Sequence, residues 1–256
     1  MSIEDDRLWL TRSPLSGDPA VRLFCFPYAG GSSGLFRTWP KSLPPDVEVL
    51  SLNMPGRQAR IAEPPIRDIR TLVDAFGPVA MRYALVPFVL FGYSLGGLVA
   101  FEVARYLSRR SISPAALIVA ACAAPTASRR TPAISDMPDP QFVAAFREFA
   151  NLPDDVVDDP HLMRLVLPML RADVGMAEKY VRADGECLTC RIHTIIGQDD
   201  PTTPLAAVTL WKEETLGEVA STTVPGNHGF LHSSPDEVLR VVQRELALAR
   251  ISSASP

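Results

Sequence analysis

The feature that most constrains the fold is a serine flanked by glycines, Gly92-Tyr93-Ser94-Leu95-Gly96, at the boundary between two hydrophobic patterns. The apolar run Phe88–Tyr93 predicts a buried strand, and the run Leu95–Arg109 has the apolar spacing of a helix. A strand that turns directly into a helix leaves little room at the turn, and glycines provide that room. The chain therefore contains a tight strand–turn–helix unit with Ser94 at the turn.

The same alternation of strand and helix patterns extends along most of the chain. Helical patterns cover Ile69–Leu85, Thr203–Thr215 and Pro235–Ala249. Alternating elements predict a mostly parallel central sheet flanked by helices, and 256 residues fit one domain over 1–256. Short apolar runs predict the remaining strands at Val21–Pro27, Val47–Asn53, Ala116–Ala123, Arg191–Gly197 and Val219–Val224, with a weaker strand at Leu8–Arg12.

One segment, about residues 125–186, interrupts this alternation because it carries no strand pattern. Helical patterns at Asp139–Ala150, His161–Leu170 and Asp173–Val181 are separated by turns rich in proline and aspartate. We expect these helices to form a lid insertion over the carboxyl-terminal edge of the sheet.

The setting of Ser94 indicates a nucleophile. A serine in a G-x-S-x-G turn between strand and helix has a strained backbone that presents its hydroxyl at the edge of the sheet. The N–H of Leu95 then lies at a helix N-terminus, where it can stabilise a developing oxyanion. The simpler alternative is a glycine-rich helix start with an N-cap serine.

A histidine and an aspartate follow in the order that such a serine requires. His228 lies in a glycine-containing loop after the last predicted strand, and His232 is its rival. Asp199 and Asp200 both follow the strand Arg191–Gly197, and we favour Asp200 because it lies past the turn. The order serine, acid, histidine predicts an α/β-hydrolase fold with a Ser94–Asp200–His228 triad.

A second oxyanion donor is expected from a glycine-rich loop after an early strand. Pro27-Tyr28-Ala29-Gly30-Gly31 is such a loop, and we assign the second N–H to Ala29, beside that of Leu95. An ordinary Gly-Gly turn is the alternative interpretation.

Composition excludes several classes of protein. A net charge of −4 gives no basic field for nucleic acid, and no run approaches the ~20 apolar residues of a membrane span. The acidic N-terminus lacks a hydrophobic run, so we expect a cytoplasmic protein. Cys187 and Cys190 form a C-x-x-C with His193 close behind, but no fourth ligand at zinc spacing is visible, which favours a plain loop.

With these residues placed, the sequence resembles the type II thioesterases, the discrete editing enzymes of modular polyketide and non-ribosomal peptide synthases. The resemblance covers nearly the whole chain. It implies catalysis by Ser94, Asp200 and His228 and an oxyanion hole at Ala29 and Leu95. The segments that carry it are Phe26-Pro27-Tyr28-Ala29-Gly30-Gly31, Met54-Pro55-Gly56-Arg57, Phe91-Gly92-Tyr93-Ser94-Leu95-Gly96-Gly97, Ala100-Phe101-Glu102-Val103-Ala104 and Leu167-Pro168-Met169-Leu170-Arg171-Ala172-Asp173, together with Trp211 and Thr215.

The resemblance also implies a substrate. It is an aberrant or stalled acyl group held as a thioester on the phosphopantetheine arm of an acyl carrier or peptidyl carrier protein. The phosphopantetheine belongs to that substrate, so the enzyme itself needs no cofactor or metal. The chain departs from the family at Tyr28 and Tyr93, where histidine is frequent, and at Gly229-Phe230, where two aromatic residues are frequent.

Other functions fit the same sequence pattern. A general serine esterase or lipase and an acyltransferase would use the same fold, and a receptor that keeps the fold without catalysis is a more distant alternative. We also consider that Arg57, Arg60, Arg171 and Arg182 contact an acidic carrier protein, although scattered arginines usually face solvent.

Overall fold

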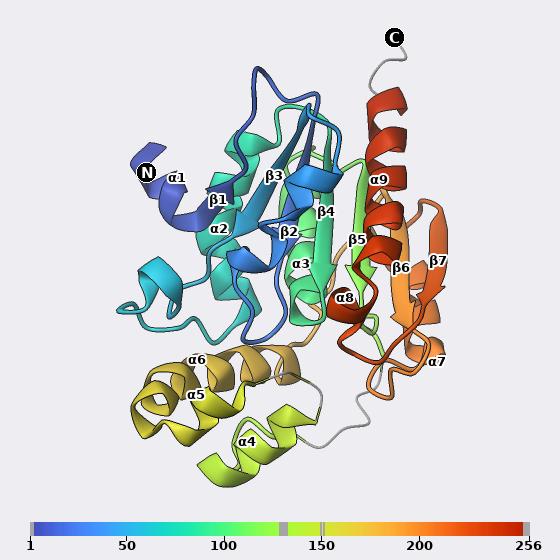
Figure 1. Ribbon diagram of the computed structural model, residues 1–256. Helices are drawn as coiled ribbons and strands as arrows, with labels where there is room; N and C mark the ends of the chain where they lie inside the picture. Colours follow the sequence, from blue (N-terminus) through green and yellow to red (C-terminus); the bar gives the residue numbers. More distant parts are fainter. Residues whose placement is uncertain (1–2, 128–132, 149, 151, 253–256) are drawn as a thin grey trace.

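The computed structural model describes residues 3–127, 133–148, 150 and 152–252. Within them, the strands form a seven-stranded sheet in the order β1-β3-β2-β4-β5-β6-β7 (Figure 1). The pair β1–β3 is antiparallel and the other neighbouring pairs are parallel, which confirms the predicted mostly parallel sheet. The strands are β1 Leu10–Arg12, β2 Val21–Phe26, β3 Val47–Leu52, β4 Phe88–Tyr93, β5 Ala116–Ala120, β6 Arg191–Gly197 and β7 Val219–Val224.

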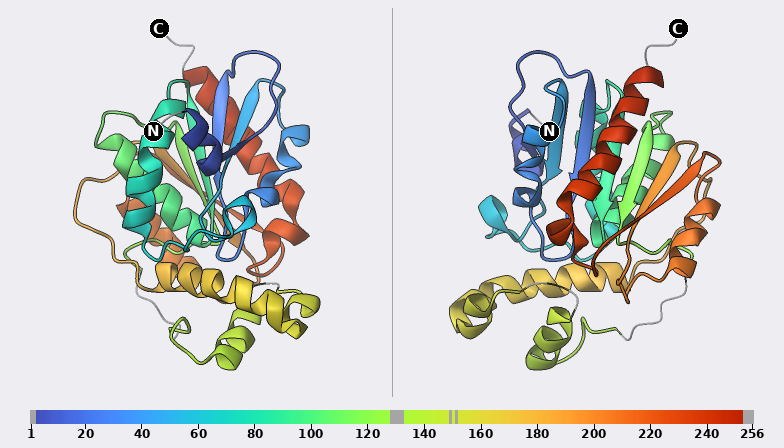
Figure 2. Two further views of the ribbon diagram at one scale, coloured as in Figure 1. Left: turned by 90° about the vertical axis from the view of Figure 1, so that its left-hand side faces the viewer. Right: turned by 45° about the vertical axis from the view of Figure 1, so that its right-hand side comes forward.

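Side chains of the inner strands alternate between two hydrophobic cores, one on each face of the sheet. On β2, Phe24 and Phe26 belong to one core, whereas Leu23 and Cys25 belong to the other. The helices α2 Ile69–Tyr83 and α3 Leu95–Ser108 pack on the first face, and α9 Pro235–Ser252 packs on the second (Figure 2). Burial on both faces explains why these strands are almost continuously apolar in sequence.

The prediction of one helix over Thr203–Thr215 was wrong. Pro204 has an extended backbone at the N-cap position, so the helix starts only at Leu205. It continues as α7 for four residues and then tightens into a 3₁₀ helix. The remaining short elements are α1 Ile3–Trp9, α7 Leu205–Val208 and α8 Phe230–Ser233, with 3₁₀ helices at Ser33–Phe36, Trp39–Ser42, Gln58–Arg60 and Thr209–Glu213. Among the helices described, none is long and apolar enough to cross a membrane.

The helices α4 Asp139–Arg147, α5 Asp154–Asp158 and α6 Pro160–Glu178, here called the helical insertion, lie between β5 and β6 in the chain. They extend across the carboxyl-terminal ends of the parallel strands, below the arrowheads in Figure 1 and in both views of Figure 2. The predicted helices at His161–Leu170 and Asp173–Val181 are in fact one helix, α6. The sequence pattern broke there because Asp173, a charged residue, is buried on the face that packs against the body.

Candidate active site

Ser94 lies at the sharp turn between β4 and α3. Its backbone has φ 53° and ψ −119°, outside the regions that a residue with a side chain ordinarily adopts. A Cβ atom at Gly92 would lie 2.1 Å from the Gly96 carbonyl oxygen, and one at Gly96 would lie 2.1 Å from the Phe26 carbonyl oxygen. Both glycines are therefore required for β2, β4 and α3 to approach this closely.

The structure brings His228 and Asp200 to Ser94. The Nε2 atom of His228 lies 3.0 Å from the Ser94 Oγ, and its Nδ1 atom lies 2.8 Å from the Asp200 Oδ2. Asp200 follows β6 and His228 follows β7, so both come from loops at the same edge of the sheet as the Ser94 turn. Asp199 is exposed, whereas the Asp200 carboxyl group is buried, so the geometry favours Asp200 as the histidine's partner.

Thr202 is a further member of this hydrogen-bond network, and no sequence pattern indicated it. Its hydroxyl lies 2.7 Å from the Asp200 Oδ1 and 2.7 Å from the His228 Nδ1, and its N–H donates to the same Oδ1 at 2.9 Å. Burial alone would raise the pKa of Asp200, but hydrogen bonds from His228 and Thr202 outweigh it and lower that pKa to about 2. Asp200 is therefore ionised throughout the neutral range.

Tyr93, which precedes the serine, holds the loop that carries the histidine. Its hydroxyl donates to the His228 carbonyl oxygen at 2.5 Å and accepts from the Leu231 N–H at 3.3 Å. Burial raises the pKa of Tyr93 well above its ordinary value, so the phenol stays protonated and able to donate. A residue at which the chain departs from the family it resembles thus anchors the backbone of His228.

The two predicted oxyanion donors come from the start of α3 and from the loop after β2. Leu95 is the first residue of α3, so its N–H is one of those that a helix leaves without an intrahelical acceptor. Ala29 lies in a turn closed by a hydrogen bond from the Gly31 N–H to the Tyr28 carbonyl oxygen at 2.8 Å. Gly30 at the third position of this turn has φ +81°, the conformation that a type II turn demands there.

The other histidines have different partners. His232, the rival candidate, lies with its Nε2 atom 3.0 Å from the Tyr28 hydroxyl. His193 is buried within β6, with its Nδ1 2.7 Å from a Glu245 carboxylate oxygen. His161 lies on α6, where it contacts Arg164.

The four arginines considered as carrier contacts are all engaged in ion pairs. Arg57 pairs with Asp173, Arg60 with Glu63, Arg171 with Asp139 and Arg182 with Glu214. Arg57 and Arg60 are also buried, with 6% and 7% of their surface exposed, so the prediction that they face a partner was wrong for these two.

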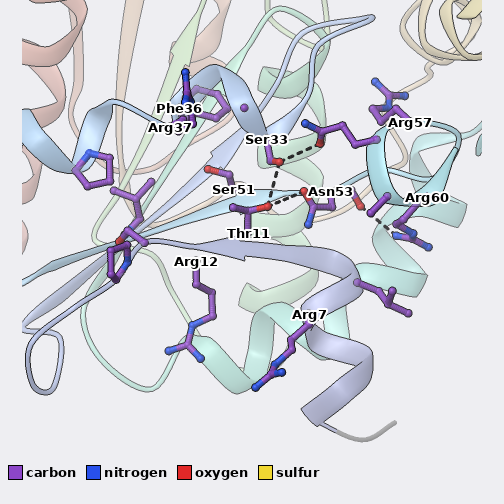
Figure 3. Close-up of a pocket in the computed structure, with 18 residues that line it drawn as sticks. Arg7, Thr11, Arg12, Ser33, Phe36, Arg37, Ser51, Asn53, Arg57 and Arg60 are labelled. Atoms are coloured by element: carbon purple, nitrogen blue, oxygen red, sulfur yellow. Dashed lines mark hydrogen bonds between the residues drawn. The ribbon is translucent and has the colours of Figure 1, made fainter.

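A hollow of about 460 Å³ lies beside β1 and β3 (Figure 3). Its lining comes from residues 7–60 and therefore does not include Ser94, Asp200 or His228. Hydrogen bonds from the Thr11 hydroxyl to Asn53 and Ser33 link side chains of this lining. The hollow is thus separate from the candidate active site.

Ser94 lies at a strained turn between β4 and α3 of a mostly parallel sheet. It is hydrogen-bonded to a histidine, which is hydrogen-bonded in turn to an aspartate. This arrangement defines a class of protein. The chain is an α/β-hydrolase with the residue arrangement of the serine hydrolases.

Within that class, a family model described as "Thioesterase domain" matches residues 21–246, and the chain belongs to this family. It is 34% identical over 251 residues to "Thioesterase PikA5" of Streptomyces venezuelae, covering 96% of this chain and 88% of the relative. It is 31% identical over 241 residues to "Gramicidin S biosynthesis protein GrsT" of Aneurinibacillus migulanus, covering 94% of each.

A solved structure agrees with these sequence relatives. The type II thioesterase BorB from the borrelidin biosynthetic cluster has a TM-score of 0.85 and 33% identity, covering 94% of this chain and 97% of BorB. The expected resemblance to type II thioesterases and the expected α/β-hydrolase fold are confirmed.

Proposed function

We propose that this thioesterase hydrolyses aberrant or stalled acyl groups from the phosphopantetheine arms of carrier-protein domains in a polyketide or non-ribosomal peptide synthase. The observation that carries the proposal is the 3.0 Å contact between the Ser94 Oγ and the His228 Nε2, in a chain similar to PikA5, GrsT and BorB. A thioester carbonyl is an electrophile that such a serine can attack.

In the first half of the proposed reaction, the Ser94 Oγ attacks the thioester carbonyl carbon while the His228 Nε2 takes the hydroxyl proton. Asp200 holds the imidazole in the tautomer with its proton on Nδ1 and stabilises the imidazolium that forms. The N–H groups of Ala29 and Leu95 bind the developing oxyanion. The carbon–sulfur bond then breaks, and the thiol leaves with the proton that His228 returns.

In the second half, water replaces the thiol. His228 removes a proton from the water as its oxygen attacks the acyl-serine, and the same oxyanion donors act again. Collapse of the tetrahedral intermediate breaks the bond to the Ser94 Oγ, which regains its proton from His228. The products are a free acid and a regenerated serine, so the reaction needs neither a metal nor a cofactor of the enzyme.

The remaining proposals concern the setting of this chemistry. We assign residues 125–186 as the lid of a single domain over 1–256, because the helical insertion extends across the strand ends that carry the candidate triad. An acyl or peptidyl carrier protein is the proposed partner, since it holds the thioester. The cytoplasm is the proposed location.

Release of acid from an acyl-phosphopantetheinyl carrier protein tests the proposal. Wild type is expected to clear short acyl chains, and Ser94→Ala is expected to lose at least about 10³-fold in rate. Ser16→Ala, at an exposed loop position, is the matched control and should behave as wild type.

The alternatives give different results in the same experiment. Hydrolysis of p-nitrophenyl esters without action on the carrier protein would refute the assignment of substrate and indicate a general esterase. Transfer of the acyl group to another acceptor, seen by product analysis, would indicate an acyltransferase. Failure of a fluorophosphonate to label Ser94 would indicate a receptor without catalysis.

A further inference from the structure

The helical insertion reaches the oxyanion turn through one buried carboxylate, that of Asp173 on α6. This side chain has no exposed surface. Its Oδ2 atom accepts from the Gly30 N–H at 2.7 Å and from the Arg57 Nη1 at 2.8 Å, and its Oδ1 accepts from the Arg57 Nη2 at 2.7 Å. The carboxylate is therefore satisfied by an arginine in a two-point contact and by the backbone of the turn.

Arg57 also contacts the turn directly. It follows β3, 6% of its surface is exposed, and its Nη1 atom also donates to the Gly31 carbonyl oxygen at 2.8 Å. The pair thus holds the N–H of Gly30 and the C=O of Gly31, one on each side of the Gly30 α-carbon. Those two groups belong to the Ala29–Gly30 and Gly31–Ser32 peptides, so the two contacts fix the peptide planes on either side of the Gly30–Gly31 peptide.

The direction of the Ala29 N–H follows from the shape of this turn. In a trans peptide the C=O and N–H point in opposite directions, so the Ala29 N–H points away from the Tyr28 carbonyl oxygen. That oxygen accepts from the Gly31 N–H inside the turn, and the Ala29 N–H is consequently directed out of it. Any force that keeps Gly30 and Gly31 in place also keeps the Ala29 N–H in its direction.

Apolar contacts join the same two parts of the molecule. Ala29 packs both against the main core and against the separate cluster of the helical insertion. A Cβ atom at Gly30 would lie 2.7 Å from Leu170 Cδ2, so this α6 side chain covers the turn directly. The helical insertion therefore contacts the turn through both charge and packing.

A buried ion pair is not an efficient source of stability, because desolvation of both charges offsets their attraction, and apolar replacements are often tolerated. What the pair provides at this location is a defined geometry for two backbone groups. The geometry points to Asp173 and Arg57 as positioning residues: the oxyanion turn keeps its working shape only while α6 is seated on it, so closure of the insertion and assembly of the oxyanion hole are one event. This inference rests on the proposed role of Ala29.

The test compares Asp173→Asn with wild type in the hydrolysis of a p-nitrophenyl ester, which requires no carrier protein. We expect kcat to fall about 10- to 100-fold, less than the ~10²–10³-fold of a deleted oxyanion donor, with KM changed less than about threefold. The affinity for a trifluoromethyl ketone, which forms a tetrahedral oxyanion on a serine, should fall in proportion to kcat. The control variant Asp139→Asn removes the ion pair between Asp139 on α4 and Arg171 on α6, the helix that also carries Asp173. It should leave kcat, KM and the ketone affinity within twofold of wild type.

A double variant separates positioning from folding. Arg57→Met with Asp173→Leu removes both charges while keeping the site filled, and it is expected to fold and to show the same loss in kcat. Unchanged kcat and ketone affinity in both variants, or a loss confined to KM, would overturn the inference.

Hydrogen exchange in the wild-type protein adds a measurement that no folding defect can obscure. The Gly30 amide should exchange at the rate of the buried amides of α6, because both open together. Exchange of Gly30 much faster than that of α6 would also overturn the coupling. If the wild type released no acid from the acyl carrier protein, the proposed function would fall, and hydrogen exchange would still test the contact.

Discussion

Replacing Thr202 by valine should slow hydrolysis about tenfold without removing it. The Nε2 of His228 must be unprotonated to accept from Ser94, so the ring proton is on Nδ1, between Asp200 Oδ2 at 2.8 Å and the Thr202 Oγ1 at 2.7 Å. The Thr202 hydroxyl has a single proton, which it donates to the Asp200 Oδ1 at 2.7 Å. Its lone pair therefore faces the imidazole, and the hydroxyl holds both partners at once.

The magnitude follows from the bonds that valine removes and those that it keeps. A hydrogen bond to a charged group contributes about 1.5–3 kcal/mol, and each 1.36 kcal/mol in a barrier is a factor of ten in rate. The Thr202 N–H still donates to Asp200 Oδ1 at 2.9 Å, which keeps the loss near the lower value. Asp200→Asn, which supplies the wrong partner to Nδ1, should cost on the order of 10⁴.

The assay is kcat/KM for a p-nitrophenyl ester from pH 6 to 8, with Thr202→Ser as the matched control. Serine retains the hydroxyl and should stay within about threefold of wild type. The pKa of Asp200 is about 2 in the wild type, and the valine variant keeps the lowering contacts of His228 and of the Thr202 N–H, so Asp200 should stay ionised and the loss should not vary over this pH range. A loss below twofold, or an equal loss in the serine variant, would refute the role of the hydroxyl.

Three further changes probe the surroundings of the serine. Tyr93→Phe removes the hydroxyl that donates to the His228 carbonyl oxygen, so it should lower the free energy of unfolding by about 1 kcal/mol, which lowers the unfolding temperature by roughly 2–4 °C, and should also reduce kcat. Calorimetry and ester hydrolysis check this, and an unchanged unfolding temperature would contradict it. Gly96→Ala forces a methyl group to 2.1 Å from the Phe26 carbonyl oxygen, so it should lower the free energy of unfolding by at least about 3 kcal/mol. A urea midpoint equal to that of wild type would contradict this, because it would show that the backbone adjusts more easily than expected. The pKa of Asp200 is lowered from 3.8 to about 2 on folding, so the stability that this carboxylate contributes to the folded state is complete above pH ~4 and is lost as pH falls toward 2. The difference in unfolding free energy between wild type and Asp200→Asn should therefore narrow by roughly 1 kcal/mol from pH 6 to pH 3, and a constant difference would contradict the shift.

The positions of Ser94, Asp200 and His228 were readable from sequence because each follows a strand. Parallel strands bring their carboxyl ends to one edge of the sheet, so residues far apart in the chain meet there. The apolar runs of β2 to β6 gave those strands directly, since burial on both faces leaves little polar interruption.

The contacts that support these residues were not readable in the same way. Arg57 and Asp173 are 116 positions apart, and no local pattern pairs them. A charged residue normally indicates an exposed face, so Arg57 suggested a partner surface and Asp173 suggested the start of a new helix. Thr202 gave no signal because a hydroxyl residue after a turn is common in loops of every function.

The helical insertion has a hydrophobic cluster of its own, made of Phe142, Phe146, Leu152, Met169, Leu170 and Val174. The two cores of the sheet draw on other residues, so side chains of this cluster can be exchanged while the sheet keeps its packing. Substitutions within this cluster are therefore expected to carry little risk to the foldability of the body. An insertion transplanted from a relative is compatible with this arrangement when it brings a carboxylate to the place of Asp173.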